Sequence, residues 1–149
     1  MTRIDFYLLG DGARGGRDVA ACRLADKAFR LGHRIYVLAA DAEHSRGLDQ
    51  LLWTFSAGSF IPHALNSDAA DTQLPVLVGH DDPPAAHEDV LITLAARVPD
   101  CFPRFQRVAE VVDGSDGEKT LARERFCFYR DRGYALQTHK ISAGDFVEA

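Results

Sequence analysis

The sequence predicts an α/β domain in which a mainly parallel, open sheet is covered by helices on both faces. Two observations carry this prediction. Short apolar segments rich in β-branched and aromatic residues alternate along the chain with segments whose apolar residues recur at helical spacing. One of the short segments, residues 33–40, lacks polar alternation, which is typical of a strand buried on both sides in a parallel sheet. The expected arrangement is therefore a three-layer α/β domain.

The first half of the chain supplies two strands and two helices to this arrangement. Residues 4–9 are an apolar run that ends in glycines, and residues 33–40 are a second apolar run, so both are expected to be strands. Residues 18–31 have the apolar spacing of a helix, and Gly32 is suited to end it. Asp41 is suited to cap a further helix that reaches Trp53. Pro62 excludes a central strand over residues 59–63, because proline has no N–H to donate.

The second half continues the alternation. Residues 74–78, 89–94 and 108–112 are expected to be strands, residues 79–88 a loop, and residues 101–107 a short helix. Ser115 or Asp116 is suited to cap a long last helix that runs to about Arg132 and ends at Gly133. A final strand is expected at residues 134–139. We expect residues 1–140 to form a single domain and residues 141–149 to be a flexible C-terminal tail.

Composition and charge exclude several classes of function. A formal net charge of −5 argues against a protein that binds nucleic acid with its whole surface. The three cysteines form no CxxC pair, which favours reduced thiols in a cytoplasm. No apolar stretch is long enough to span a membrane, and the N-terminus does not resemble a signal sequence. The six histidines show no HxxxH or HExxH pairing, so no metal site is expected. No GxSxG motif places a nucleophile.

One glycine motif offers an alternative function. Gly10, Gly12 and Gly15 form a literal GxGxxG directly after the first strand, and Asp41 follows the second strand, where an acid would meet a ribose. The expected fold resembles a nucleotide-binding, Rossmann-like domain, so an NAD(P)- or nucleotide-binding module is a genuine alternative. However, three further residues, starting with Gly16, precede the first apolar position of the helix. We therefore favour a glycine-rich turn without a ligand, and no cofactor is expected.

The last predicted helix carries the most informative pattern. Residues 117–134 hold five Lys or Arg against three acids, a basic segment in an acidic protein. Leu121, Arg125, Phe128, Tyr129 and Arg132 fall on one broad face, which should lie on the sheet. Arg125 is in the middle of that face and should pair with a buried acid or carbonyl, because an unpaired buried guanidinium is costly.

A second face of the same helix mixes cations with an aromatic ring. Lys119, Arg123, Phe126 and Arg130 gather there. This combination suits an acidic peptide with an apolar anchor, or single-stranded nucleic acid that stacks on the ring. The alternative is an ordinary solvated helix face. The net charge of the chain argues against direct binding of DNA.

Six short segments together resemble one known family. They are FYLL at residues 6–9, LLW at 51–53, SFIPH at 59–63, DVLI at 89–92, EVVD at 110–113 and LARERF at 121–126, with a Tyr and a Gly-Tyr pair following the last. In this order and spacing they resemble the chi subunit of bacterial DNA polymerase III over nearly the whole chain. The resemblance implies an α/β fold and an accessory subunit of the clamp loader with no catalytic activity of its own.

The resemblance also implies two partners and their sites. The acidic C-terminal tail of single-stranded-DNA-binding protein would bind Lys119, Arg123, Phe126 and Arg130. The family often has a basic residue where this chain has Cys127, which puts one charge contact in doubt, and Phe126 keeps an apolar wall without a tyrosine hydroxyl. The psi subunit of the clamp loader would bind a surface that includes Trp53, Phe60 and Pro62. Contact with DNA would be indirect, and the protein would act in the cytoplasm, away from membranes.

Overall fold

The computed structural model describes residues 2–10, 16–68 and 73–141. The regular elements follow one another in this order along the chain: β1 (Arg3–Leu9), α1 (Gly16–Arg30), β2 (Ile35–Leu38), α2 (Ala42–Thr54), β3 (His63–Leu65), the 3-10 helix η1 (Asn66–Asp68), β4 (Val76–Gly79), β5 (Val90–Thr93), the 3-10 helix η2 (Phe102–Arg104), β6 (Arg107–Val112), α3 (Asp116–Asp131) and β7 (Ala135–Ile141).

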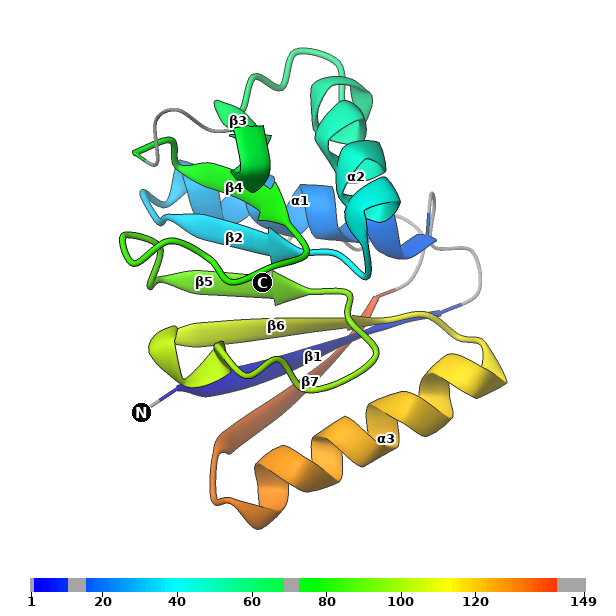
Figure 1. The fold of residues 1–149 in the computed structure, drawn as a ribbon. Helices are drawn as coiled ribbons and strands as arrows, with labels where there is room; N and C mark the ends of the chain where they lie inside the picture. The colour runs from blue at the N-terminus through cyan, green and yellow to red at the C-terminus, as the bar shows by residue number, and fades with distance from the viewer. Residues whose placement is uncertain (1, 11–15, 69–72, 142–149) are drawn as a thin grey trace.

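The strands form one open, parallel sheet. Over the described residues the sheet has seven strands in the order β3-β4-β2-β5-β6-β1-β7, and each neighbouring pair is parallel (Figure 1). This confirms the predicted α/β class and the parallel sheet. β1 lies between β6 and β7, so the first strand of the chain is next to the edge strand at which the described part of the chain ends.

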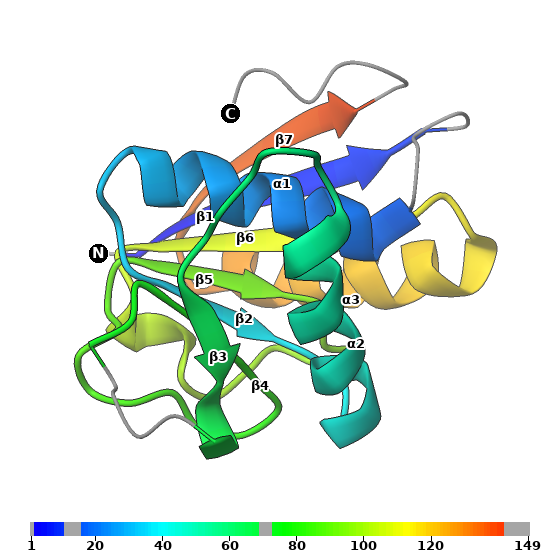
Figure 2. The ribbon, with the colours of Figure 1, turned by 90° about the horizontal axis from the view of Figure 1, so that it is seen from above.

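Helices cover both faces of the sheet and enclose two apolar cores. α1 and α2 lie on one face and α3 lies on the other (Figures 1 and 2). Tyr7 and Leu9 of β1 belong to the core beneath α1 and α2. Ile4 and Phe6 of the same strand belong to the core beneath α3 and η2. The side chains of a strand alternate between faces, so one short apolar strand contributes to both cores.

Local signals fix the ends of the helices as the sequence predicts. The side chain of Asp41 accepts a hydrogen bond from the backbone N–H of His44, and that of Ser115 accepts one from Glu118, so both are N-caps. Gly32 and Gly133, which follow α1 and α3, have φ values of 88° and 82°. Side chains other than glycine rarely adopt that left-handed conformation, which explains both stops.

The structure corrects the prediction for the inward face of α3. Its buried residues are Ala122, Arg125 and Tyr129, whereas Leu121 is 39% exposed and Arg132 is exposed. The inward face is therefore rotated by part of a turn from the predicted one. β3 was not predicted: it starts directly after Pro62 and is an edge strand, where the missing N–H of a proline does no harm.

Two sequence predictions fall mainly outside the described residues. Residues 11–15, which hold most of the GxGxxG motif, are one, and residues 142–149, most of the expected tail, are the other. Ile141, the first residue of that expected tail, is buried at the end of β7. None of the described helices has the length and apolar character needed to cross a membrane.

Candidate partner-binding site

A groove of about 320 Å³ lies between α3 and the strands β1 and β7. Three residues of the predicted cationic–aromatic face, Lys119, Arg123 and Phe126, line it. We call this cavity the α3 groove. Its volume is within the range of pockets that hold a ligand of a few side chains. The structure therefore brings three of the four residues predicted for the tail of a partner protein to one cavity.

The strands supply the rest of the groove. Its other lining residues are Phe6, Leu8 and Leu9 of β1, Val112 of β6, Asp113 after it, Ala122 of α3 and Thr138 of β7. The ring of Phe126 meets the ring of Phe6 edge to face, with centroids 5.5 Å apart. The floor and one wall are thus apolar, and this pair of rings holds the wall in place.

The cations lie at the rim of this apolar cavity. Lys119 and Arg123 are exposed, while Phe126 is half-buried. Within the described part of the chain, neither cation forms a side-chain ion pair. Exposed cations that border an apolar cavity favour a ligand that combines carboxylates with an apolar side chain.

Arg130, the fourth predicted residue, lies outside the groove lining. It is exposed, and its guanidinium donates to Asp131 with N–O distances of 3.1 and 3.2 Å. That hydrogen bond is the main cause of the raised pKa of Arg130. An exposed pair of this kind is screened by water and contributes little to stability. Arg130 therefore remains a prediction for the outer end of the site.

Sequence reasoning missed the strand residues of the groove. Phe6 and Leu8 are two residues apart in β1, so they share the face toward α3. The alternation of Phe6 and Leu8 could be recognised in the sequence, but no local pattern indicates that β1 lies beneath α3. Asp113 was missed as well, and it adds one acid to the lining of the groove.

A buried ion pair holds α3 on the sheet. Arg125, of which only 3% of the side chain is exposed, donates from Nε to Oε1 of Glu110 at 2.9 Å, and from Nη1 to the carbonyl of Ala96 at 2.9 Å. Tyr129 donates from its hydroxyl to Oε2 of Glu110 at 2.8 Å. This confirms the prediction that Arg125 pairs with a buried acid or a carbonyl, and the structure shows both partners. Burial raises the pKa of Glu110, and the contacts with Arg125 and Tyr129 oppose that effect.

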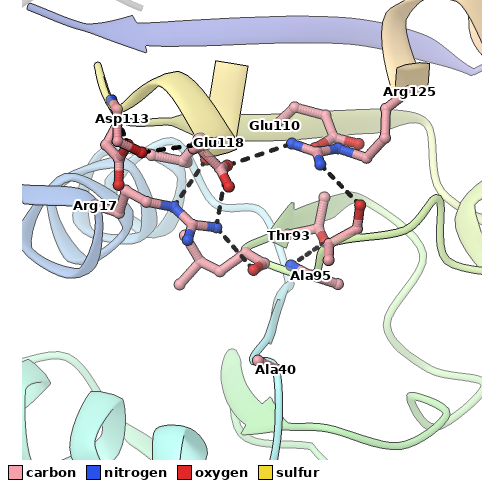
Figure 3. A network of polar contacts seen from close by, with 12 residues as sticks. Arg17, Ala40, Thr93, Ala95, Glu110, Asp113, Glu118 and Arg125 are labelled. Carbon is pink, nitrogen blue, oxygen red and sulfur yellow. Dashed lines mark hydrogen bonds and ion pairs between the residues drawn. The ribbon is translucent and has the colours of Figure 1, made fainter. Parts of the chain in front are cut away.

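The network continues from α3 to the start of α1 (Figure 3). Nη2 of Arg125 and Nη2 of Arg17 lie 3.5 and 3.6 Å from Oε1 of Glu118. Arg17 also donates to the carbonyls of Leu94 and Val111, at 2.7 and 3.2 Å. The guanidinium of Arg17 therefore lies at the carboxyl ends of β5 and β6. The two guanidinium groups connect the first turns of α1 and α3 to the carboxyl-terminal half of β6 and the chain after β5.

The other predicted partner surface lies on α2 and the chain that leads into β3. Trp53 is 54% exposed and Phe60 is 80% exposed, and Pro62 is exposed beside them in sequence. The Trp53 ring lies over the buried ring of His63, with centroids 4.3 Å apart. The nitrogens of His63 lie 2.6 and 2.9 Å from the carbonyl oxygens of Ile61 and Asp49. This imidazole links Asp49, in the middle of α2, to the chain before β3, and it packs against the ring of Trp53.

The strand order argues against the dinucleotide hypothesis. In that fingerprint the glycine loop and the ribose-binding acid follow neighbouring strands. Here β5 and β6 lie between β1 and β2, so the ends of β1 and β2 are separated by three strand spacings, or about 14 Å. Asp41 is also engaged as the N-cap of α2. No cluster of possible metal ligands occurs among residues 2–10, 16–68 and 73–141.

Comparisons with known proteins agree with the sequence motifs. The family model of the DNA polymerase III chi subunit, HolC, matches residues 1–137. DNA polymerase III subunit chi of Pseudomonas aeruginosa is 42% identical over 141 residues, which cover 95% of this chain and 98% of that protein. Its counterpart in Escherichia coli K12 is 31% identical, with 93% and 97% coverage.

A solved structure shows a similar fold. The crystal structure of T4 UvsW matches with a TM-score of 0.65 and 8% identity, over 95% of this chain and 42% of that chain. At that identity the likeness concerns the α/β fold alone. The family model and the relatives reach further, because the model matches residues 1–137 and the two relatives cover 95% and 93% of the chain. The chain therefore belongs to the chi subunit family of DNA polymerase III.

Proposed function

We propose that this chain is a non-catalytic adaptor in the DNA polymerase III holoenzyme. One of its surfaces binds the psi subunit, which connects it to the clamp loader. Another binds the acidic C-terminal tail of single-stranded-DNA-binding protein. The chain contacts DNA only indirectly, through that second partner, and acts in the cytoplasm without a cofactor.

The α3 groove is the observation that carries this proposal. It combines two exposed cations, Lys119 and Arg123, with an apolar wall formed by Phe126 and Phe6. An acidic peptide that ends in an apolar residue matches both parts, since its carboxylates meet the cations and its apolar side chain enters the cavity. The psi surface is supported by the exposure of Trp53 and Phe60, because large exposed aromatic side chains are typical anchors of protein interfaces.

The test of the tail site is a binding measurement with one matched control. The probe is a synthetic peptide that copies the last nine residues of the organism's single-stranded-DNA-binding protein, and affinity is measured by calorimetry. Arg123→Ala should weaken binding about tenfold or more, because a hydrogen bond to a charged group contributes about 1.5–3 kcal/mol. Arg23→Ala removes an exposed arginine from α1, on the other face of the sheet, and should leave the affinity unchanged.

Salt dependence gives an independent check of the same site. Contacts between exposed charges are screened, so affinity should fall as the salt concentration rises from 50 to 500 mM. The Arg123→Ala variant should show a weaker dependence, since one charge contact is missing. Equal affinity of Arg123→Ala and the unchanged chain, with both folded by circular dichroism, would exclude the α3 groove as the tail site.

A further inference from the structure

The edge strand β7 sends alternate side chains to the two faces of the sheet. Leu136 packs against the core beneath α3, and Thr138 lines the α3 groove. Ile141 belongs to the core beneath α1 and α2, on the other face. Side chains two residues apart in a strand share one face. Lys140, two residues after Thr138, therefore extends from the face of the sheet that carries the groove.

The pairing of β7 with β1 brings Lys140 next to the lining of the groove. Lys140 is the partner of Leu8 in the register of these two parallel strands, and Leu8 lines the groove. Neighbouring strands are about 4.8 Å apart, and the flexible stem of a lysine carries its ammonium group about 6 Å from the Cα atom. The ammonium group of Lys140 can therefore reach a ligand in the groove from the side of β7.

The two cations of α3 lie on the opposite side of the groove, at a similar height along it. α3 connects the parallel strands β6 and β7, so it runs antiparallel to them (Figure 1). The ring contact between Phe126 and Phe6 gives a common starting point. From there Arg123 and Lys119 lie about 4.5 and 10 Å toward the carboxyl ends of the strands, because a helix rises about 1.5 Å per residue. Lys140 lies about 7 Å in the same direction, because its partner in β1 is two positions beyond Phe6.

The positive charge of Lys140 is available to a ligand. The side chain is exposed, and over residues 2–10, 16–68 and 73–141 it forms no ion pair. With Lys119 and Arg123 it places three cations around the groove, whose lining contains one acid, Asp113. Cations that face a cavity from two sides favour a ligand that carries several carboxylates.

We propose that Lys140 is a further binding residue of the α3 groove and pairs with an acidic side chain of the bound tail from the side of β7. The tail then lies between Lys119 and Arg123 on α3 and Lys140 on the edge strand. This inference rests on the proposed function, because it concerns the same ligand. It makes the groove selective for peptides with several acids, since the two sides together present more cations than one terminal carboxylate can pair with.

The first measurement is the affinity of the nine-residue tail peptide for the full chain by calorimetry. Lys140→Ala should weaken binding about three- to fivefold, less than Arg123→Ala does, because an exposed lysine pair is screened by water. Lys140→Arg keeps the charge and should bind within about twofold of the unchanged chain. Arg23→Ala removes one positive charge from the other face of the sheet and should leave the affinity unchanged, so it controls for net charge.

The second measurement identifies the contact on the peptide. In a set of peptides, each acidic residue in turn is replaced by the corresponding amide. One replacement should weaken binding to the unchanged chain about three- to fivefold and have almost no effect on binding to Lys140→Ala, because the pair is already broken in that variant. The other replacements should have equal effects on both chains.

Three results would overturn the role of Lys140. They are an unchanged affinity of Lys140→Ala, a loss of the same size in Arg23→Ala, and equal effects of every peptide replacement on both chains. In each case weak binding by Arg123→Ala would leave the proposed function intact. If the tail peptide does not bind the unchanged chain at all, the proposed function fails and the inference about Lys140 fails with it.

Discussion

At the residue scale, Arg125 is the side chain on which the position of α3 depends. It is 3% exposed and its main partner, Glu110, is fully buried. Arg125→Ala leaves the carboxylate of Glu110 without its charged partner, so we expect the free energy of unfolding to fall by about 3–5 kcal/mol. Urea denaturation monitored by circular dichroism measures it.

A double variant separates the loss of the pair from the loss of packing. Arg125→Met together with Glu110→Gln removes both charges and keeps an acceptor for the hydroxyl of Tyr129. It should be more stable than Arg125→Ala, because no buried charge is left unpaired.

The single variant Arg125→Ala should also become less stable as the pH rises. Burial already raises the pKa of Glu110, and an acid with a raised folded pKa contributes stability that is lost as the pH rises through that pKa. A loss of less than 1 kcal/mol in Arg125→Ala would contradict this role.

At the element scale, Asp5 ties three neighbouring strands together. It belongs to β1, and its carboxylate lies 2.8 Å from Arg107 in β6 and 3.1 Å from both His139 in β7 and Arg3 in its own strand. Burial alone would raise the pKa of Asp5. The hydrogen bond with His139 and the charges of Arg107 and Arg3 outweigh it, so the pKa lies below its ordinary value of 3.8.

This arrangement predicts how stability depends on acid. A carboxyl group with a depressed folded pKa stabilises the fold fully above its unfolded pKa, and the contribution is lost as the pH falls through the folded pKa. The melting temperature should therefore decrease below pH 3.8, and Asp5→Asn should lower it at pH 6 but flatten its decrease in acid. Thermal unfolding from pH 2 to 6 measures both. A parallel decrease in the variant and in the unchanged chain would show that other carboxylates dominate.

The strands and helices differ in how clearly the sequence predicts them. β1, β5 and β6 were predictable because each is an apolar run buried on both faces, and α2 because Asp41 caps it. β3 has three residues and exists because it pairs with β4, a contact that no local pattern encodes. The inward face of α3 was predicted wrongly because the larger apolar residue, Leu121, was placed toward the sheet. The neighbouring Ala122 is the buried residue, and an alanine gives only a weak hydrophobic signal in the sequence.

The residues of the α3 groove likewise comprise some that the sequence predicts and some that it does not. Lys119, Arg123 and Phe126 were predictable because they share one face of a single helix. Phe6, Leu8 and Thr138 were not, since they line the groove only through the strand order, which brings β1 and β7 beneath α3. β1 and β7, the first and last described strands, are neighbours although paired residues such as Arg3 and Ala135 are 132 positions apart in sequence. The part of the groove lining that comes from β1 and β7 could therefore not be predicted from the sequence.

At the scale of the whole molecule, the two proposed partner surfaces are far apart. The α3 groove lies on the α3 face at β1 and β7, whereas Trp53 and Phe60 belong to α2, on the other face, and to the chain before β3, the opposite edge strand (Figures 1 and 2). Five strand spacings, or about 24 Å, separate β3 from β1. A peptide in the groove and a protein on the aromatic surface should therefore bind at the same time.

This separation predicts independent binding of the two partners. Effects of substitutions at sites more than about 10 Å apart, with no shared partners, usually add. Trp53→Ala should weaken binding of the psi subunit by at least tenfold, as expected for a large aromatic anchor, and leave the affinity for the tail peptide unchanged. Arg123→Ala should do the reverse, and the double variant should show both losses in full. Calorimetric titration of each partner, alone and with the other at saturation, tests this. A change of more than about threefold in either affinity on saturation would mean that the sheet couples the two surfaces, and the adaptor would then act as a switch rather than a passive bridge.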